Sequence, residues 1–330
     1  MEILDYLPKY VHKIEYTNED EWLEERKKGI GGSDVSVVLG LNKYKSKLQL
    51  YKEKVEDFKE DMSNNVFVKK GKDLESFIRE NYVVPYFKDK GYTVLHPEVI
   101  LVNEAFPNLR ANLDGLAVPD SGDFTQNTVV EIKWVSEYSE DNWDNDDYFG
   151  IPVNYYAQVQ EYMLVTSADK AVVCALFDSD WTVKYYEIPF SYDFCEKMVH
   201  EVDTFMDTNV MFKIPPSVNC ALDKNFILDS LNNTKNALPD LVEDDSMTEL
   251  IIRYKEYKSN IKTLEKVCND TLSELTEKYL KGLVPSSPLH GIRMTVCKST
   301  KFDTNRFKEE HPELYKEYLT TSEYTRTTIK

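Results

Sequence analysis

Residues 128–135 read TVVEIKWV and decide how the whole chain is interpreted. In an extended strand successive side chains point to opposite faces, so Glu131 and Lys133 share one face while Ile132 and Trp134 share the other. An ionised pair is unusual on such an apolar strand, because a buried charge is costly without a partner. The segment therefore predicts a strand that also carries a candidate site.

An acidic residue precedes this strand in the segment LRANLDGLAV, residues 109–118. A run of turn residues separates the two segments, which predicts an antiparallel hairpin. Asp114 and Glu131 would then converge on one hard cation through oxygen ligands, as Mg²⁺ prefers. Lys133 would lie close enough to position or help deprotonate the attacking water, and Glu75 is a candidate third carboxylate. The competing interpretation is that these are surface charges on an edge strand.

Two flanking segments add polar groups. In the helix predicted over 154–166, Tyr155, Gln158 and Tyr162 fall on one face, and Gln158 could reach a phosphate or the attacking water. The alternative is a surface amide beside two core tyrosines.

Near the N-terminus, Arg26 ends one predicted helix, a glycine-rich turn follows, and Ser33 or Asp34 is a plausible N-cap for the next. A forked guanidinium beside a helix N-terminus suits a terminal phosphate, although such a turn is often only a tight connection.

The order of predicted elements indicates a mixed α and β protein. We expect helices over 19–28, from 33 to 39, and over 48–54, 71–87 and 154–166, and strands over 94–102, 109–118, 128–135, 171–177 and 182–189. After Pro215 and Pro216 the character changes, and 247–280 predicts a long amphipathic helix, half of a helical pair or a coiled-coil arm. A strand from 291 and a short helix after 304 follow. We therefore expect two domains, 1–215 and 216–330.

Composition bounds the function. The chain has 330 residues, 42% of them hydrophobic, which excludes wholesale disorder, and no apolar run is long enough for a membrane span. Five scattered cysteines indicate a reducing compartment.

With 58 acidic against 40 basic residues the net charge is −18, which by itself argues against a nucleic-acid partner. Eleven of these negative charges, however, lie in 137–148 and 240–249, away from the candidate site. The early lysines, Lys43 to Lys54, are where we expect a local basic entrance if the partner is nonetheless a nucleic acid.

Five segments in this order resemble the YqaJ-type phage recombinases, relatives of lambda exonuclease in the PD-(D/E)XK nuclease superfamily. The matching segments, within 22–177, are WLEERKKGIGGSDVSVVLGLN at 22–42, GKDLE at 71–75, LRANLDGLA at 109–117, VVEIKW at 129–134 and YYAQVQEYMLV at 155–165. Residues 301–330 also resemble the end of such phage proteins. The resemblance implies an α/β nuclease core with a central mixed sheet flanked by helices.

The resemblance also implies an activity and a set of roles. The chain would be a Mg²⁺-dependent 5′→3′ exonuclease that degrades linear double-stranded DNA in recombination by strand annealing, with two ions per site and Mn²⁺ as an alternative. Asp114, Glu131 and the Ile132 carbonyl would bind one metal ion, and Glu75 would contribute to the second. Lys133 and Gln158 would act on the attacking water. Arg26 and Ser33 would bind the 5′-phosphate. The resemblance further implies a trimer, a single-strand-annealing partner protein and a phage-encoded enzyme in the bacterial cytoplasm.

Two other functions remain open. A structure- or site-specific endonuclease of the same superfamily would have no use for a 5′-phosphate pocket. A catalytically inactive DNA-binding or scaffold protein built around the long helix would not need the complete set of acids and the lysine. Iron–sulfur nucleases of this superfamily are disfavoured, since they need clustered cysteines.

Overall fold

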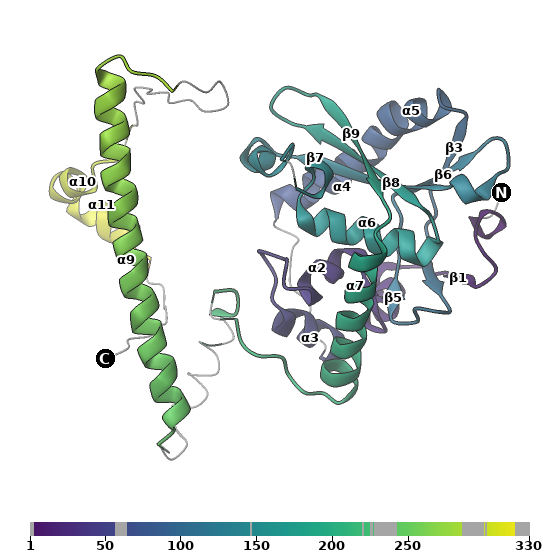
Figure 1. The fold of residues 1–330 in the computed structure, drawn as a ribbon, viewed down its shortest axis with the longest axis horizontal. Coiled ribbons are helices and arrows are strands. Elements are labelled where there is room, and N and C mark those ends of the chain that lie inside the picture. The colour runs from purple at the N-terminus through teal and green to yellow at the C-terminus, as the bar shows by residue number, and fades with distance from the viewer. Residues whose placement is uncertain are drawn as a thin grey trace. The chain divides into compact units, whose positions relative to one another are not determined.

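A five-stranded mixed sheet lies at the centre of the first part of the chain (Figure 1). Its strand order is β3-β6-β7-β8-β9, and only the β7–β8 pair is parallel. The strands of the chain are β1 Val11–Ile14, β2 Ile30–Gly31, β3 Tyr92–Leu95, β4 Ile100–Asn103, β5 Leu109–Arg110, β6 Gly115–Pro119, β7 Thr128–Val135, β8 Lys170–Phe177 and β9 Val183–Pro189. Two small ladders, β1–β4 and β2–β5, lie outside this sheet.

The computed structural model describes residues 3–56, 65–145, 147–219, 221–224, 227, 243–285, 300 and 302–320. By their contacts the residues divide into two compact units, 1–224 and 225–330, which we treat separately. The boundary expected at 215/216 stays a prediction. The strand expected from 291 lies outside the described residues.

Helices cover both faces of the sheet. Those of the first unit are α1 Glu19–Lys27, α2 Gly32–Val38, α3 Lys47–Val55, α4 Val66–Ile78, α5 Val84–Lys88, α6 Val153–Thr166 and α7 Tyr192–Thr204. Five residues of π-helix, Arg79–Val83, join α4 to α5, and Phe205–Met211 extend α7 in the same way. On one face, Ile78 and Phe87 pack against Ile132 of β7 in a buried apolar cluster. On the other face α6 contacts β7 and β8 and packs extensively against α2.

The predicted α/β core with a central mixed sheet flanked by helices is confirmed. Strand β7 has the predicted bounds because its period-two pattern fits a strand with both faces covered. The strand expected over 94–102 is two strands, β3 and β4, since the chain bends around Pro97, which cannot donate a ladder hydrogen bond. The segment 109–118 is likewise divided into β5 and β6, which leaves Asp114 immediately before β6.

The helix after the glycine-rich turn begins earlier than predicted. Its N-cap is Gly31, in extended conformation, and not Ser33 or Asp34. Ser33 lies inside the helix, and the carboxylate of Asp34 is drawn into contacts with Arg26 and lysines from neighbouring segments. A tertiary ion pair has therefore overridden the local capping preference of Asp34.

The second unit is dominated by one helix, α9, over Asp245–Leu280, followed by α10 Thr304–Glu310 and α11 Pro312–Glu317. Asp244 caps α9 by accepting a hydrogen bond from the backbone N–H of Ser246. None of the 36 residues of α9 is buried. Across the described residues of both units, no helix is long and apolar enough to cross a membrane.

Candidate active site

Strands β6 and β7 bring Asp114 and Glu131 together. Their antiparallel register pairs Gly115 with Val130, so Asp114, one residue earlier, lies beside Glu131. The Asp114 side chain accepts a hydrogen bond of 2.8 Å from the backbone N–H of Ile132. This contact holds the carboxylate over β7, as the predicted hairpin requires.

Glu131 and Lys133 form a pair on one face of β7, with Glu131 buried and Lys133 partly exposed. Glu131 is 0% exposed, and the Lys133 ammonium donates to its Oε1. The second oxygen, Oε2, is buried and has no hydrogen-bond partner among the described residues. Burial, reinforced by the Asp114 charge, raises the pKa of Glu131 to about 8. Burial lowers the pKa of Lys133, but Glu131 and Asp114 outweigh it, so this pKa lies above its ordinary value and the ammonium stays charged.

Glu75 approaches the same cluster from α4. The Arg79 guanidinium, one turn along, donates to Glu75 and, through Nε, to the Asp114 carbonyl at 3.2 Å. Burial and then the Asp114 charge raise the pKa of Glu75. Asp114 therefore lies close enough to both glutamates for its charge to disfavour their ionisation.

The three carboxylates suit a hard divalent cation in chemistry. All their donor atoms are oxygens, as Mg²⁺ prefers, and a buried carboxylate oxygen without a partner is the kind of group a cation satisfies. Within the described ranges, however, no three His, Cys, Asp or Glu side chains are already arranged around an ion position. Lys133 and Arg79 each engage one oxygen of Glu131 and Glu75. The donor set fits the expected metal, while these two cations supply part of the charge balance.

Helix α6 carries Gln158 and Tyr162 toward the same face of the sheet. Both side chains are buried, and the Gln158 amide donates to the Tyr162 hydroxyl at 3.0 Å. Burial, together with the Glu131 and Asp114 charges, raises the pKa of Tyr162 well above its usual value. Tyr155, on the same helix, places its ring 4.8 Å from the Lys133 ammonium. The predicted polar face of this helix is therefore next to the carboxylates.

Gly32 allows α2 to approach α6 at this point. A Cβ on Gly32 would lie 2.5 Å from the Tyr162 ring and 3.0 Å from the Gln158 side chain. Because real Cβ atoms do not come so close, a larger residue would push these side chains away. The glycine-rich turn thus links the Arg26 segment to the carboxylate cluster.

Arg26 and Ser33 lie in contact, while their expected role on a 5′-phosphate stays a prediction. The guanidinium donates to the Ser33 hydroxyl at 3.3 Å and to Asp34 Oδ2 at 3.0 Å, and it lies 4.8 Å above the Trp22 ring. The two elements that carry them, α1 and α2, are joined by the short strand β2.

Asp34 gathers two more cations that we had assigned to an entrance for DNA. Lys45 and Lys54 contact it at 3.4 Å and 3.3 Å, and Lys54 also donates to the Arg26 carbonyl at 2.7 Å. The Lys54 side chain is only 4% exposed, so it serves this cluster and not the surface. Burial raises the pKa of Asp34, yet Arg26, Lys54 and Lys45 outweigh it, so the net shift is downward.

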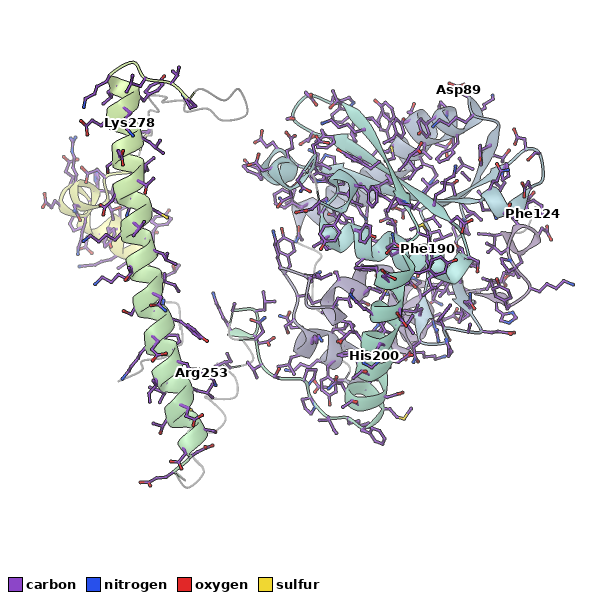
Figure 2. All side chains as sticks on the ribbon, in the orientation of Figure 1. Asp89, Phe124, Phe190, His200, Arg253 and Lys278 are labelled. Carbon is purple, nitrogen blue, oxygen red and sulfur yellow. The ribbon has the colours of Figure 1, made fainter. Side chains whose placement is uncertain are left out.

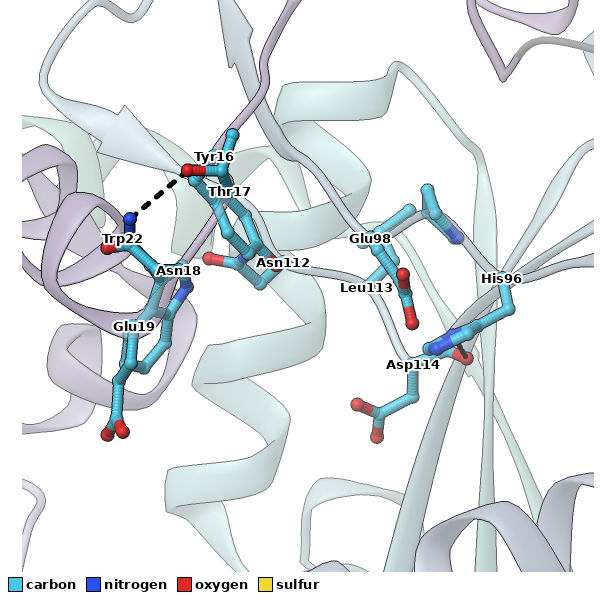
Figure 3. Close-up of a pocket in the computed structure, with 11 residues that line it drawn as sticks. Tyr16, Thr17, Asn18, Glu19, Trp22, His96, Glu98, Asn112, Leu113 and Asp114 are labelled. Carbon is cyan, nitrogen blue, oxygen red and sulfur yellow. Dashed lines mark hydrogen bonds between the residues drawn. The ribbon is translucent and has the colours of Figure 1, made fainter.

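A pocket of about 580 Å³ opens beside Asp114, while Glu75 and Glu131 do not line it. Figure 3 shows Tyr16 and Trp22 on one side of it and His96 and Asp114 on the other. His96 Nδ1 lies 3.1 Å from the Asp114 carbonyl oxygen. The pocket therefore extends from the Arg26 segment to the catalytic candidate Asp114.

Three residues of this region were missed in the sequence. Arg79, the partner of Glu75, follows it by four positions on a helical face and could have been found from that spacing. Nothing in the sequence next to Asp34 indicates that its carboxylate is a counter-ion for basic side chains. Glu161 is fully buried on α6 and both its oxygens lack a partner among the described residues, and burial raises its pKa well above the usual value. It resembles any exposed helical glutamate in the sequence.

The fold and the arrangement of the acids come first. An acid before one strand and a Glu-x-Lys on its antiparallel neighbour lie on a mixed sheet between helices, which is the arrangement expected from the resemblance to PD-(D/E)XK nucleases. Residues 21–169 match a family model described as the YqaJ-like viral recombinase domain. The match confirms the resemblance seen in the five sequence segments.

Individual proteins are also similar to this chain. The chain is 24% identical over 315 residues to the uncharacterized protein YqaJ of Bacillus subtilis strain 168, with 94% of each chain covered. Among solved structures it is similar to the alkaline exonuclease LHK-Exo of Laribacter hongkongensis, with 17% identity, a TM-score of 0.44, and 58% of this chain and 95% of that chain covered. It is also similar to a phage-related exonuclease of Haemophilus somnus 129PT, with 12% identity, a TM-score of 0.41, and 56% and 96% covered.

Proposed function

We propose that this chain is a Mg²⁺-dependent 5′→3′ exonuclease that degrades linear double-stranded DNA in phage-type recombination by strand annealing. The observation that carries the proposal is the cluster of Asp114, just before β6, with the fully buried Glu131 and the partly exposed Lys133 on the neighbouring strand β7, joined by Glu75. The YqaJ-like domain match and the exonucleases among similar folds agree with it.

The carboxylates would hold the metal. Asp114, Glu131 and the Ile132 carbonyl are the proposed ligands of one ion, and Glu75 contributes to a second. When bound, the ions supply Lewis-acid activation of water and neutralise charge on the phosphate and the leaving oxygen. The roles of these residues are proposals from chemistry and position.

Lys133 is suited to orient the attacking water. Its raised pKa keeps it charged, so it can donate to the water and to a phosphate oxygen but does not act as the resting-state base. The contact with Glu131 and the ring of Tyr155 restrict where its ammonium can lie. Gln158, whose amide is bonded to Tyr162, would reach the same water or phosphate.

Arg26 and Ser33 would bind the 5′-terminal phosphate. The guanidinium is fixed by Asp34 and its plane lies over Trp22, so its remaining donors are preorganised for a phosphate. A pocket for a terminal phosphate favours an exonuclease over an enzyme that cuts within a strand. The pocket that Trp22 and Asp114 line, with the aromatic rings of Tyr16 and Trp22 at its wall, is suited to the terminal nucleotide.

The wider setting of the enzyme is also a proposal. Residues 1–215 would form the exonuclease core and 216–330 an extension. DNA would be enclosed by a trimer, and a single-strand-annealing protein would bind the 3′ strand that degradation exposes.

The test is digestion of three duplexes with Mg²⁺: linear DNA labelled at the 5′ end, linear DNA labelled at the 3′ end, and closed circular DNA. We expect labelled mononucleotide to be released first from the 5′-labelled ends and the circle to survive. Cleavage of the circle would indicate an endonuclease. Binding without cleavage of any duplex would indicate the inactive DNA-binding protein. Addition of EDTA is the control for metal dependence.

A further inference from the structure

Helix α9 leaves a long apolar stripe uncovered. Its large apolar side chains at Leu250, Tyr254, Tyr257, Ile261, Leu264 and Leu275 are between 46% and 63% exposed. Monomeric proteins rarely expose a continuous apolar surface of this extent, and a 36-residue helix spans roughly 54 Å. The described residues of α10 and α11 do not cover it. Among the described residues of the second unit, the stripe is thus left without a covering segment.

The spacing of the stripe is that of a two-stranded coiled coil. Apolar residues recur in alternating steps of three and four, which is the heptad pattern with a and d positions apolar. Position a holds Met247, Tyr254, Ile261, Cys268 and Leu275, and position d holds Leu250, Tyr257, Leu264, Thr271 and Lys278. Only the last two d positions are polar, so the pattern extends over most of the helix.

The two ends of α9 differ in charge. Asp244, Asp245 and Glu249 make its start acidic, whereas near its end Lys278 and Lys281 are paired with Glu274 and Glu277. Two parallel copies would place the two acidic starts side by side. Two antiparallel copies would place each acidic start beside an end in which acids and bases balance, which removes this repulsion.

The residues that flank the stripe favour the same orientation. With Ile261 opposite Leu264 of the second copy, antiparallel pairing sets Arg253 beside Glu274 and Lys258 beside Glu265, each twice by symmetry. Parallel pairing would instead set Arg253 beside Lys258. Figure 2 shows Arg253 toward one end of α9 and Lys278 toward the other.

Glu274 remains open to such a contact. It is paired with Lys278 one turn along its own helix at 2.7 Å, but the two side chains are 66% and 57% exposed. A second cation can therefore approach the carboxylate from the partner helix. We propose that α9 forms an antiparallel two-stranded coiled coil with α9 of a second copy of this chain, centred between Ile261 and Leu264. This contact is separate from the trimer proposed for the nuclease core and would join copies that belong to different trimers.

A cross-linking experiment on the full chain tests the orientation. Cys268 is exposed and occupies an a position, so antiparallel pairing puts it opposite Tyr257, and parallel pairing puts it opposite Cys268 of the second copy. With Cys220 and Cys297 replaced by serine, Tyr257→Cys should give a disulfide-linked dimer on mild oxidation, mapped by mass spectrometry to positions 257 and 268. Ser259→Cys, on the outer face of the helix, is the matched control and should not.

A charge exchange supplies an independent measurement. Arg253→Glu should weaken self-association, measured by sedimentation equilibrium, by roughly tenfold, because two attractive pairs become repulsive. Adding Glu274→Arg should restore it to within roughly twofold. The proposal is overturned if Cys268 links to Cys268 without the Tyr257→Cys change, if the Ser259→Cys control links equally well, or if the double exchange restores nothing.

Discussion

The Lys133 ammonium donates to one oxygen of the fully buried Glu131, and the other oxygen of that carboxylate has no partner among the described residues. The two side chains leave β7 on the same face, two residues apart. The Lys133 ammonium therefore pairs with one oxygen of the buried Glu131 carboxylate, and the other oxygen is available to a divalent ion.

Glu131→Gln should reduce degradation of linear duplex DNA by at least roughly 100-fold, because several kcal/mol of charge stabilisation depend on this carboxylate. The amide keeps the shape of the side chain, so far-UV circular dichroism should not change. Mg²⁺ should raise the thermal midpoint of the wild-type chain and raise that of the variant less. Undiminished nuclease activity in the purified variant would exclude Glu131 from the site.

Arg26→Ala should reduce the preference for 5′-phosphorylated over 5′-hydroxyl ends by roughly tenfold or more, since a hydrogen bond to a charged group contributes about 1.5–3 kcal/mol. The measurement is the ratio of initial rates on the two duplexes. Lys28→Ala, an exposed position just past the end of α1, is the control. If Arg26→Ala slows both substrates equally, the residue does not read the terminal phosphate.

Trp22→Ala should weaken the binding of dAMP roughly tenfold, because stacking of one base on an aromatic side chain contributes about 1–3 kcal/mol. Trp22→Phe should retain most of the affinity. Isothermal calorimetry measures this without catalysis, and Trp181→Ala, 47% exposed on another surface, is the control. Equal affinity in Trp22→Ala and the wild type would place the nucleotide elsewhere.

Asp34→Asn should lower the free energy of unfolding at pH 7 by about 3–5 kcal/mol, because Arg26, Lys45 and Lys54 lose a buried counter-ion. The pKa of Asp34 is lower in the folded than in the unfolded chain, so its stabilisation is present above the unfolded pKa of about 3.9 and is lost as the pH falls toward the folded pKa.

Urea unfolding of wild type and Asp34→Asn should therefore differ by a constant amount above about pH 5 and converge in more acidic solution. Glu196→Gln, at an exposed position on α7, is the control and should follow the wild type. A difference that does not shrink at low pH would mean that Asp34 acts through packing and not through its charge.

Gly32→Ala should destabilise the first unit by about 1–3 kcal/mol and reduce activity, because the new methyl group would displace Tyr162 and Gln158. Gly71→Ala is the matched control. It lies within α4 with nothing within 4 Å of the added Cβ, so it should raise stability by about 0.5–1 kcal/mol. Urea midpoints of the two variants decide the comparison.

Local pattern predicted the elements that bear the carboxylates. Strand β7 and helix α6 were predicted almost to the residue, because period-two and period-3.6 patterns belong to single segments. The strand over 94–102 was predicted as one element and is two, since hydropathy does not register where a chain leaves one sheet for another.

The chain by itself determined the order of its elements and the presence of three acids, a lysine and an arginine with the right chemistry. These depend on side-chain type and short-range periodicity. Only the tertiary structure decided that Lys45 and Lys54 form ion pairs with Asp34 and that Gly32 packs against Tyr162. It also decided that one oxygen of Glu131 has no hydrogen-bond partner among the described residues. Such contacts join residues far apart in the chain, and their free energy depends on burial, which exists only once the core has closed.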